Sequence, residues 1–323
     1  MAQSTKQALL AALSAAEGGY ISGQQLAEAL GVSRAAIHKA AAALIAQGYA
    51  LEAVSRRGYR LLGGDPFCAE AVGYYPAPVQ VYDTLESSNR TAKLLALDGA
   101  PHGTLVLTAH QSAGRGRLGR RFESPAGKGV YCSVLLRPEM PAANAQTATI
   151  SAAVAVCRAV KKLCGLELAI KWVNDLWRDG RKVCGILTEA ALDMESGMLD
   201  YAVLGLGFNI TAPPDGWPAE LQDVAGALFD DAPPPGARAA LAAAFLNEFW
   251  ALYHGVPKPE YLPEYRARQA LLGQIVTVTP RNGTPRKAEA LDIDEDCRLV
   301  VRFAGEHNLV PLRGEEVHLG KYL

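Results

Sequence analysis

Residues 114–121 read Gly-Arg-Gly-Arg-Leu-Gly-Arg-Arg, so four arginines and three glycines fall within eight positions. Apolar runs that read as core strands flank this stretch at 104–110 and 130–136, which predicts a loop inside a folded domain rather than an RNA-binding tail. Glycines allow close backbone approach, and arginine forks bind carboxylate or phosphate oxygens bidentately. The stretch lacks the Walker lysine and the dinucleotide-binding glycine pattern, which argues against an ordinary ATPase or dehydrogenase.

The surrounding block, residues 65–268, mixes strands with helices. Helices are expected near 89–97 and 145–164, and further strands near 79–83, 168–172, 183–190 and 201–210. The last two strands follow one another directly, so we expect them to pair antiparallel. The pattern predicts an α+β domain with one mixed sheet and helices packed on a face.

Residues 1–64 read as three helices followed by a hairpin. Ser22 begins the second helix with Gln25 three residues on, as in a capping box, and Gly31 ends it. Ser33 caps the third helix, and two short strands then flank Arg56-Arg57-Gly58. Two helices joined by a short turn and followed by a basic hairpin are typical of a winged helix-turn-helix domain.

The charge of this segment favours DNA as its partner. Six Lys and Arg stand against three Asp and Glu within 1–64, whereas the whole chain has 32 against 33 and a net charge of -1. The outward positions of the third helix and the hairpin are short or cationic, as contact with a major groove and with phosphates requires. The candidate DNA-binding residues are Ser33, Arg34, Ala36, His38, Lys39, Arg56 and Arg57. A protein–protein module with a solvated basic face is the alternative.

Residues 269–323 contain five short strands with tight connections, which predicts a small SH3-like β-barrel. The sequence therefore predicts an α+β multidomain protein with domains at 1–64, 65–268 and 269–323.

Composition narrows the class of protein further. Half of the 323 residues are hydrophobic, enough for a buried core, and the balanced charge argues against a polybasic or an acidic disordered chain. The six cysteines form no Cys-x-x-Cys pair, so we expect reduced thiols and no structural metal. The apolar run after Lys6 is too short and Ala-rich for a signal peptide, and no stretch is long enough to span a membrane. We expect a cytoplasmic protein without a membrane partner.

Four further motifs could carry chemistry: Ser88-Asn89, KWVNDL at 171–176, KVCGIL at 182–187 and GLGFNI at 205–210. Lys182 begins an otherwise apolar strand, where a lysine needs a partner or a function; a surface lysine at a strand edge is the alternative. Ser88-Asn89 could simply cap a helix. The small residues of GLGFNI would let a flat ligand lie against a strand.

GRGRLGR, KWVNDL, KVCGIL and GLGFNI, in this order, resemble the biotin protein ligases. With the N-terminal domain, nearly the whole chain resembles the bifunctional members, which are also biotin-operon repressors. The resemblance implies a central domain of the biotin/lipoate ligase type. It implies ATP with Mg²⁺ and biotin as reactants, biotinyl-5′-AMP as intermediate, and a lysine of a biotin carboxyl carrier protein as acceptor.

The resemblance also implies site residues. Arg115, Arg117 and Lys182 would be catalytic, because a carboxylate and an α-phosphate must meet and two anions need cations. The positions implied for biotin are Ser87, Ser88, Asn89, Gln111, Arg115, Gly116, Arg117, Lys182 and Gly185. Those implied for ATP or the adenylate are Arg117, Arg120, Arg121, Lys171, Trp172, Asn174, Asp175, Lys182, Asn209 and Trp217. Asp175 is the candidate metal ligand, or it could instead orient a neighbour.

The chain departs from the family pattern at four positions. Val173 stands where Pro is usual, Cys184 where Ala is common, Cys297 where Gly is typical, and Gly320 where the bifunctional member has an Arg near the nucleotide.

The resemblance further implies operator DNA as a partner and a homodimer favoured by biotinyl-5′-AMP. Two alternatives stay open: a lipoate-type ligase, and a ligand-sensing transcription factor without ligase activity.

Overall fold

The computed structural model describes residues 4–73, 75–141, 145–253, 259–280, 283–314 and 317–319. The chain divides into two compact units. The first comprises Met1–Pro76 and Ala232–Ala243, and the second comprises Ala77–Asp231 and Ala244–Leu323. The C-terminal strands belong to the second unit, and the division into three domains stays a prediction.

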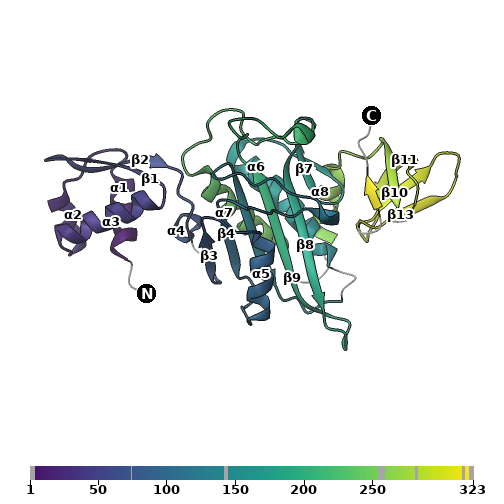
Figure 1. Ribbon diagram of the computed structural model, residues 1–323, viewed down its shortest axis with the longest axis horizontal. Coiled ribbons are helices and arrows are strands. Elements are labelled where there is room, and N and C mark those ends of the chain that lie inside the picture. The colour runs from purple at the N-terminus through teal and green to yellow at the C-terminus, as the bar shows by residue number, and fades with distance from the viewer. Residues whose placement is uncertain are drawn as a thin grey trace. The chain divides into compact units, whose positions relative to one another are not determined.

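The first unit contains the three helices and the hairpin predicted from the sequence (Figure 1). They are α1 (Thr5–Ala15), α2 (Gly23–Leu30), α3 (Arg34–Ala46), β1 (Tyr49–Val54) and β2 (Gly58–Gly64), followed by the short α4 (Ala69–Val72). Ser22 and Gln25 form the predicted capping box, and Gly31 ends α2 with a left-handed φ of 65°. The core residues are Leu9, Leu13, Leu26, Ala27, Ile37, Ala40, Ala41 and Leu44. One apolar stripe from each helix thus makes the core of this unit.

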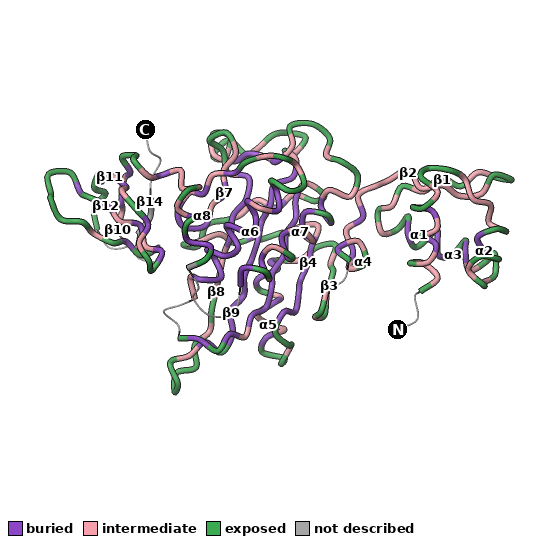
Figure 2. Tube along the Cα trace, turned by 180° about the vertical axis from the view of Figure 1, so that it is seen from behind, coloured by how far each residue is buried: buried purple, intermediate pink, exposed green. Residues whose placement is uncertain are grey.

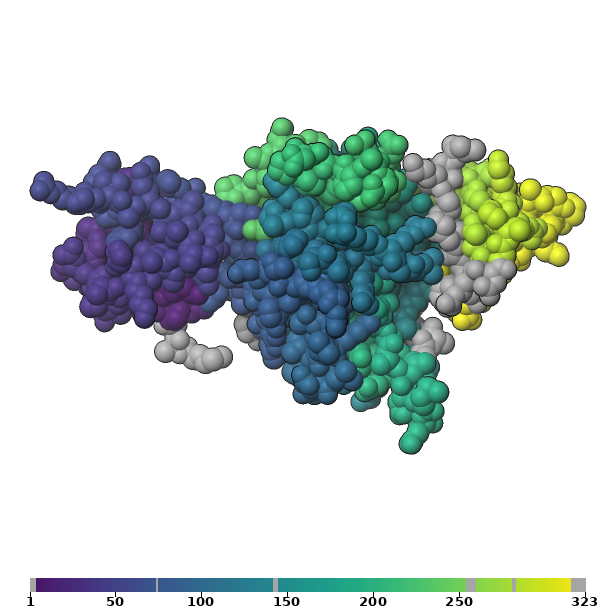
Figure 3. All heavy atoms as spheres, viewed as in Figure 1, coloured from purple at the N-terminus to yellow at the C-terminus, as the bar shows by residue number. Residues whose placement is uncertain are grey.

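A seven-stranded mixed sheet is the centre of the second unit. Its strand order is β3-β4-β5-β9-β8-β7-β6, in which only β3 and β4 pair parallel. The strands are β3 (Val79–Tyr82), β4 (Leu105–Thr108), β5 (Gly129–Leu136), β6 (Ala169–Lys171), β7 (Asp175–Arg178), β8 (Arg181–Leu192) and β9 (Leu199–Asn209). The antiparallel pairing predicted between β8 and β9 is confirmed. Their hairpin projects from the rest of the unit (Figure 3).

Helices α5 (Ser88–Leu97) and α6 (Gln146–Cys164) pack against this sheet. The buried residues concentrate along the central strands and α6 (Figure 2). Two further helices, α7 (Ala237–Leu252) and α8 (Leu262–Ala267), follow β9, and single 3₁₀ turns lie at Arg117–Gly119, Ala219–Leu221 and Pro259–Tyr261. The sequence did not predict α4, β7, α7 or α8.

The C-terminal strands form a five-stranded antiparallel sheet of order β13-β12-β11-β10-β14. They are β10 (Ile275–Pro280), β11 (Arg286–Ile293), β12 (Leu299–Phe303), β13 (Leu309–Leu312) and β14 (Val317–Leu319). All five strands were predicted. Gly320 lies outside the described residues.

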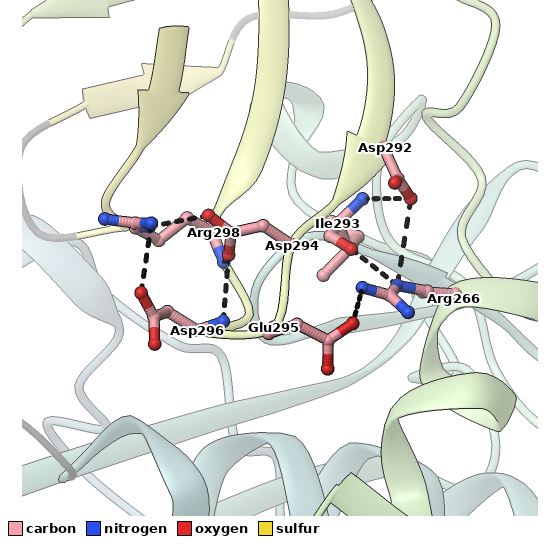
Figure 4. Close-up of polar contacts among 7 residues, drawn as sticks. All are labelled: Arg266, Asp292, Ile293, Asp294, Glu295, Asp296 and Arg298. Atoms are coloured by element: carbon pink, nitrogen blue, oxygen red, sulfur yellow. Dashed lines mark hydrogen bonds and ion pairs between the residues drawn. The ribbon is translucent and has the colours of Figure 1, made fainter.

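The turn between β11 and β12 is clamped by arginines (Figure 4). Asp294 accepts from the backbone N–H groups of Asp296 and Arg298 and pairs with the Arg298 guanidinium. Arg266 of α8 binds Ile293 O and Glu295, which ties the turn to α8. Cys297 has a φ of 61°, the left-handed region that favours glycine, which accounts for a Gly being typical there.

Among the described residues, no single helix is both long and apolar enough to cross a membrane. One bent pair, α2 with α3, meets that test by length and composition only.

Candidate functional site

The arginine-glycine stretch forms a tight loop that closes on itself. Gly116 N–H donates to Arg120 O at 2.7 Å and Phe122 N–H to Gly114 O at 2.9 Å, while Leu118 takes a left-handed φ of 56°. The loop therefore ends with the Phe122 ring against β9. A Cβ on Gly207 would lie 2.5 Å from that ring, so Gly207 makes room for Phe122. Gly205 and Gly207 also line a pocket next to this ring, as their small size predicted, whereas no sequence pattern pointed to Phe122.

Three pockets open beside this loop: one of about 790 Å³ between the loop, the start of α6 and residues 186–190 of β8, and two adjoining ones that share Lys182. The larger of the adjoining two is a cleft of about 240 Å³ lined by Arg117, Arg120, Arg121, Lys171, Trp172, Asn174, Asp175, Lys182, Asn209 and Trp217, among others. The smaller, about 40 Å³, is lined by Ser87, Ser88, Asn89, Gln111, Arg115, Gly116, Arg117, Lys182 and Gly185, among others. Every residue expected at the nucleotide thus lines the larger of these two, and every residue expected at biotin lines the smaller. Gly116, Arg117, Phe122, Asn174 and Lys182 line both pockets.

Lys182 lies where the pockets meet. Its Nζ is 2.7 Å from Asp175 Oδ1 and 5.7 Å from the centre of the Phe122 ring. About a quarter of each side chain of the ion pair is exposed, 24% for Lys182 and 26% for Asp175. A Cβ on Gly185 would lie 3.0 Å from Lys182 Nζ, so this glycine leaves space for the ammonium. Lys182 is therefore a paired, half-buried cation at the junction rather than a surface lysine.

Arg117 is the second cation at the junction. Its Nη1 donates to Asn174 Oδ1 at 3.0 Å, and its Nη2 donates to Gly314 O next to the C-terminal sheet. Asn174 Nδ2 in turn donates to Ile186 O at 2.7 Å. Arg117 is thus held against β8 by Asn174.

The segment 172–173 is anchored by groups from the C-terminal part of the chain. Trp172 Nε1 donates to Cys297 O at 3.1 Å, and Tyr265 OH donates to Val173 O at 3.0 Å. The peptide bond between Trp172 and Val173 is cis. The two hydrogen bonds hold Trp172 in place as a wall of the larger pocket.

A continuous run of buried side-chain hydrogen bonds forms the end of the smaller pocket. Gln111 Oε1 accepts from Ser88 N–H at 2.8 Å, and Gln111 Nε2 donates to Ser124 Oγ at 2.8 Å. Ser133 Oγ lies 2.8 Å from Ser88 Oγ and 2.7 Å from Asn89 Oδ1. Ser88, Asn89 and Ser133 are all buried, so this end of the pocket is polar but uncharged. No sequence pattern pointed to Ser133.

Asn209 lies at the other end of the site, in the larger pocket. Its Nδ2 donates to Gly226 O at 2.9 Å. Its buried Oδ1 has no hydrogen-bond partner among the described residues, which leaves an acceptor for a ligand amine.

The described residues were also searched for metal-ligand clusters and for reactive thiols. Among them, no group of three or more His, Cys, Asp or Glu could hold a metal ion. Burial raises the pKa of Cys132 to about 12 and that of Cys184 well above its usual value, so both thiols stay protonated and unreactive.

In the first unit, the exposed cations gather on α3 and the hairpin. Arg34, Lys39, Arg56 and Arg57 are exposed, as are Ser33 and His38, while Ala36 is half-buried. The other cations of this unit are paired with carboxylates: Lys6 with Glu70, Arg60 with Glu52 and Arg238 with Asp65. The Ser33 Oγ caps α3 by accepting from Ala36 N–H at 3.1 Å.

Comparison with known proteins agrees with this geometry. A model of the biotin/lipoate A/B protein ligase family matches residues 81–209, and a helix-turn-helix domain model matches residues 5–60. The chain belongs to the biotin/lipoate A/B protein ligase family. It is similar to the bifunctional ligase/repressor BirA of Bacillus subtilis, with 37% identity over 71% of this chain and 72% of the relative.

One further relative supports the same assignment, and one solved structure supports the fold. The biotin–[acetyl-CoA-carboxylase] ligase of Mycobacterium tuberculosis is 31% identical over 72% of this chain and 86% of its own length. The solved biotin protein ligase of Aquifex aeolicus in complex with biotin and ATP shares the fold, with a TM-score of 0.60, 20% identity, and coverage of 76% of this chain and 99% of that chain. The chain is a biotin protein ligase that carries a helix-turn-helix domain.

Proposed function

We propose that this protein joins biotin to ATP as biotinyl-5′-AMP and then transfers the biotinyl group to a lysine of a biotin carboxyl carrier protein. The observation that carries the proposal is the meeting of the two pockets at Lys182 and Arg117. The smaller pocket offers neutral donors and acceptors, which suit the uncharged ureido ring of biotin. The larger one offers cations and aromatic walls, which suit a nucleotide.

The chemistry at the junction follows from charge. In the first step a carboxylate oxygen of biotin attacks the α-phosphorus of ATP, and pyrophosphate leaves. Lys182 and Arg117 would offset the repulsion between the two anions and hold them in line, and Arg115 would hold the carboxylate from the biotin side. In the second step the lysine amine of the carrier attacks the acyl carbon, and AMP leaves.

The adenine is assigned to the part of the larger pocket around Asn209 and Trp217. Asn209 Oδ1 is a buried acceptor without a described partner, so an exocyclic amine would relieve its desolvation cost. Trp217 offers a flat apolar surface, while Arg120, Arg121 and Lys171 line the same cleft and supply positive charge for the phosphates.

Magnesium is proposed to arrive with the nucleotide. Two carboxylates line the cleft: Glu123, which pairs with Arg121, and Asp175, whose Oδ1 is engaged by Lys182. Mg²⁺ is commonly held by one or two carboxylates together with substrate phosphates and water, so one carboxylate oxygen fits a nucleotide-borne ion. Asp175 would both orient Lys182 and meet the ion.

The first unit is proposed to bind operator DNA, with α3 in the major groove and Arg56 and Arg57 on phosphates. A homodimer favoured by biotinyl-5′-AMP would match a two-fold operator. The edge of β8 supports a second copy as partner: β7 pairs with β8 only as far as Gly185, and no described strand pairs with Thr188–Leu192 on the side away from β9. An open strand edge is a template for pairing with another chain.

A biotin-dependent ATP–pyrophosphate exchange assay tests the proposal. Exchange that requires biotin supports it. Exchange with lipoate in place of biotin would make the protein a lipoate-type ligase, and no exchange with either acid would leave a transcription factor that senses a ligand.

A further inference from the structure

A run of hydrogen-bonded side chains extends from the smaller pocket to an ion pair on β8. We call it the polar chain and define it as Ser88, Ser133, Asn89, Glu189 and Lys93. Its members come from α5, β5 and β8, so they meet only in the folded protein. Ser133 lies at its centre and is fully buried, and it lines neither pocket.

The direction of each hydrogen bond in the polar chain is fixed from the Glu189 end. Lys93 Nζ lies 2.5 Å from Glu189 Oε1, and Glu189 Oε2 accepts from Asn89 Nδ2 at 2.8 Å. Burial raises the pKa of Glu189, but the bonds from Lys93 and Asn89 outweigh it and lower that pKa overall. Glu189 is therefore an ionised acceptor. The amide of Asn89 must turn its NH₂ toward Glu189 and its oxygen toward Ser133.

The remaining bonds follow from counting protons. Asn89 Oδ1 can only accept, so the single hydroxyl proton of Ser133 goes to it over 2.7 Å. The 2.8 Å contact between the two serines then needs the hydroxyl hydrogen of Ser88. Ser88 donates it to Ser133 in preference to Gln111 Oε1, which lies farther away at 3.1 Å and already accepts from Ser88 N–H. With its proton engaged there, Ser88 Oγ presents lone pairs to the pocket that it lines. Gly205 makes this arrangement possible, because a Cβ there would lie 2.1 Å from Asn89 Oδ1.

We propose that Ser133 is a positioning residue for biotin. Ser133 accepts a hydrogen bond from the Ser88 hydroxyl, and this orients the lone pairs of Ser88 Oγ so that they can accept from a ureido N–H of biotin. The inference rests on the proposed function, since it takes biotin as the occupant of the smaller pocket. It also changes the role of Asn89, which was expected to bind biotin. Both amide hydrogens of Asn89 are bound within the protein, so Asn89 orients Ser133 instead of donating to the ligand.

The test compares Ser133→Ala with wild type by steady-state exchange kinetics. We expect the KM for biotin to rise about tenfold in Ser133→Ala, within the range known for a buried group left unpaired. The KM for ATP should stay within about twofold, since Ser133 does not line the larger pocket. Glu189→Gln should reproduce only a small part of the effect, because Leu187 O still accepts from Asn89 Nδ2 and keeps the amide in the same orientation.

The matched control is Ser151→Ala. Ser151 is also a fully buried serine, it lies on α6, and its Oγ has no hydrogen-bond partner among the described residues. Its replacement should leave both KM values unchanged. Thermal unfolding of each variant checks the fold.

A second probe separates positioning from a general loss of packing. Biotin methylated on one or the other ureido nitrogen lacks one N–H donor. In wild type, the methyl group on the nitrogen that faces Ser88 should weaken binding strongly, and in Ser133→Ala the same methyl group should cost several-fold less. Equal methyl penalties in both proteins, or an unchanged KM for biotin in Ser133→Ala, would overturn the inference. If wild type itself shows no exchange with biotin, the proposed function fails instead.

Discussion

Replacing Lys182 by Ala removes one of the two cations that line both pockets. In the structure its Nζ contacts Asp175 Oδ1 at 2.7 Å, so the ammonium is already held in place before any anion binds. A unit charge about 4 Å from a phosphate oxygen contributes about 4 kcal/mol at an effective dielectric constant of about 20. Partial exposure of Lys182 reduces this, and loss of one preorganised donor typically costs about 2.7–4 kcal/mol. We expect about 2–4 kcal/mol, or about 30- to 1,000-fold in rate.

The assay for Lys182→Ala is biotin-dependent ATP–pyrophosphate exchange, with biotin binding measured separately by calorimetry. Exchange should fall by the stated factor, while weak biotin binding persists because Ser88 and Gln111 are untouched. Arg181→Ala is the matched control: it removes a cation from the neighbouring position of β8 that lines neither pocket. Exchange within threefold of wild type in Lys182→Ala would refute the reasoning.

Asp175→Asn, alone and combined with Lys182→Ala, separates the two parts assigned to Asp175. If Asp175 only orients Lys182, its replacement should have no further effect once Lys182 is gone. If it also meets the metal, the magnesium concentration at half-maximal exchange should rise in both backgrounds.

Three further predictions concern DNA, pH and assembly. Arg57→Ala should weaken operator binding uniformly across sequences and lower the salt slope by about 1, whereas Lys6→Ala, whose charge is neutralised by Glu70, should change neither in gel-shift titrations. Burial lowers the pKa of His102 in the folded protein, where its Nδ1 accepts from Arg137 N–H at 2.9 Å. The unfolded chain therefore binds a proton at His102 more readily than the folded protein does. The free energy of unfolding should not depend on His102 above about pH 6.5, and it should decrease as the pH falls from there toward the lower pKa of the folded state. Urea titrations should show this fall in wild type and less of it in His102→Gln, and parallel curves would contradict it. Biotinyl-5′-AMP should promote dimerisation and operator binding more than biotin does. Equal sedimentation of the ligand-free, biotin-bound and adenylate-bound protein would exclude this coupling.

Local sequence patterns predicted most of the fold because their signals lie within one element. Ser22 and Ser33 cap helices through bonds to groups three residues away, and the apolar stripe of α3 repeats every three to four residues. Four elements were not predicted. Helices α4 and α8 and strand β7 are four to six residues long, so their signals are too short to read, and α7 carries apolar residues, many of them alanines, on every side, which hides the helical period.

The candidate site divides in the same way between local and distant determinants. Residues that must touch a substrate carry marked chemistry in short motifs, as Arg115, Arg117 and Lys182 do. Residues that support them have ordinary identities and act across the sheet: Ser133 meets Asn89 from 44 positions away, and Asn89 meets Glu189 from 100. The register of β5, β9 and β8 decides those meetings, and no single segment encodes it. Gly205 and Gly207 illustrate the point, because both line the smaller pocket, as their small size predicted, while the sheet also places Asn89 and Phe122 against them, which no motif predicted. Sequence motifs thus identify the groups that face the reactants. The direction of each hydrogen bond in the site and the rigidity of the site instead arise from contacts that only the folded sheet creates.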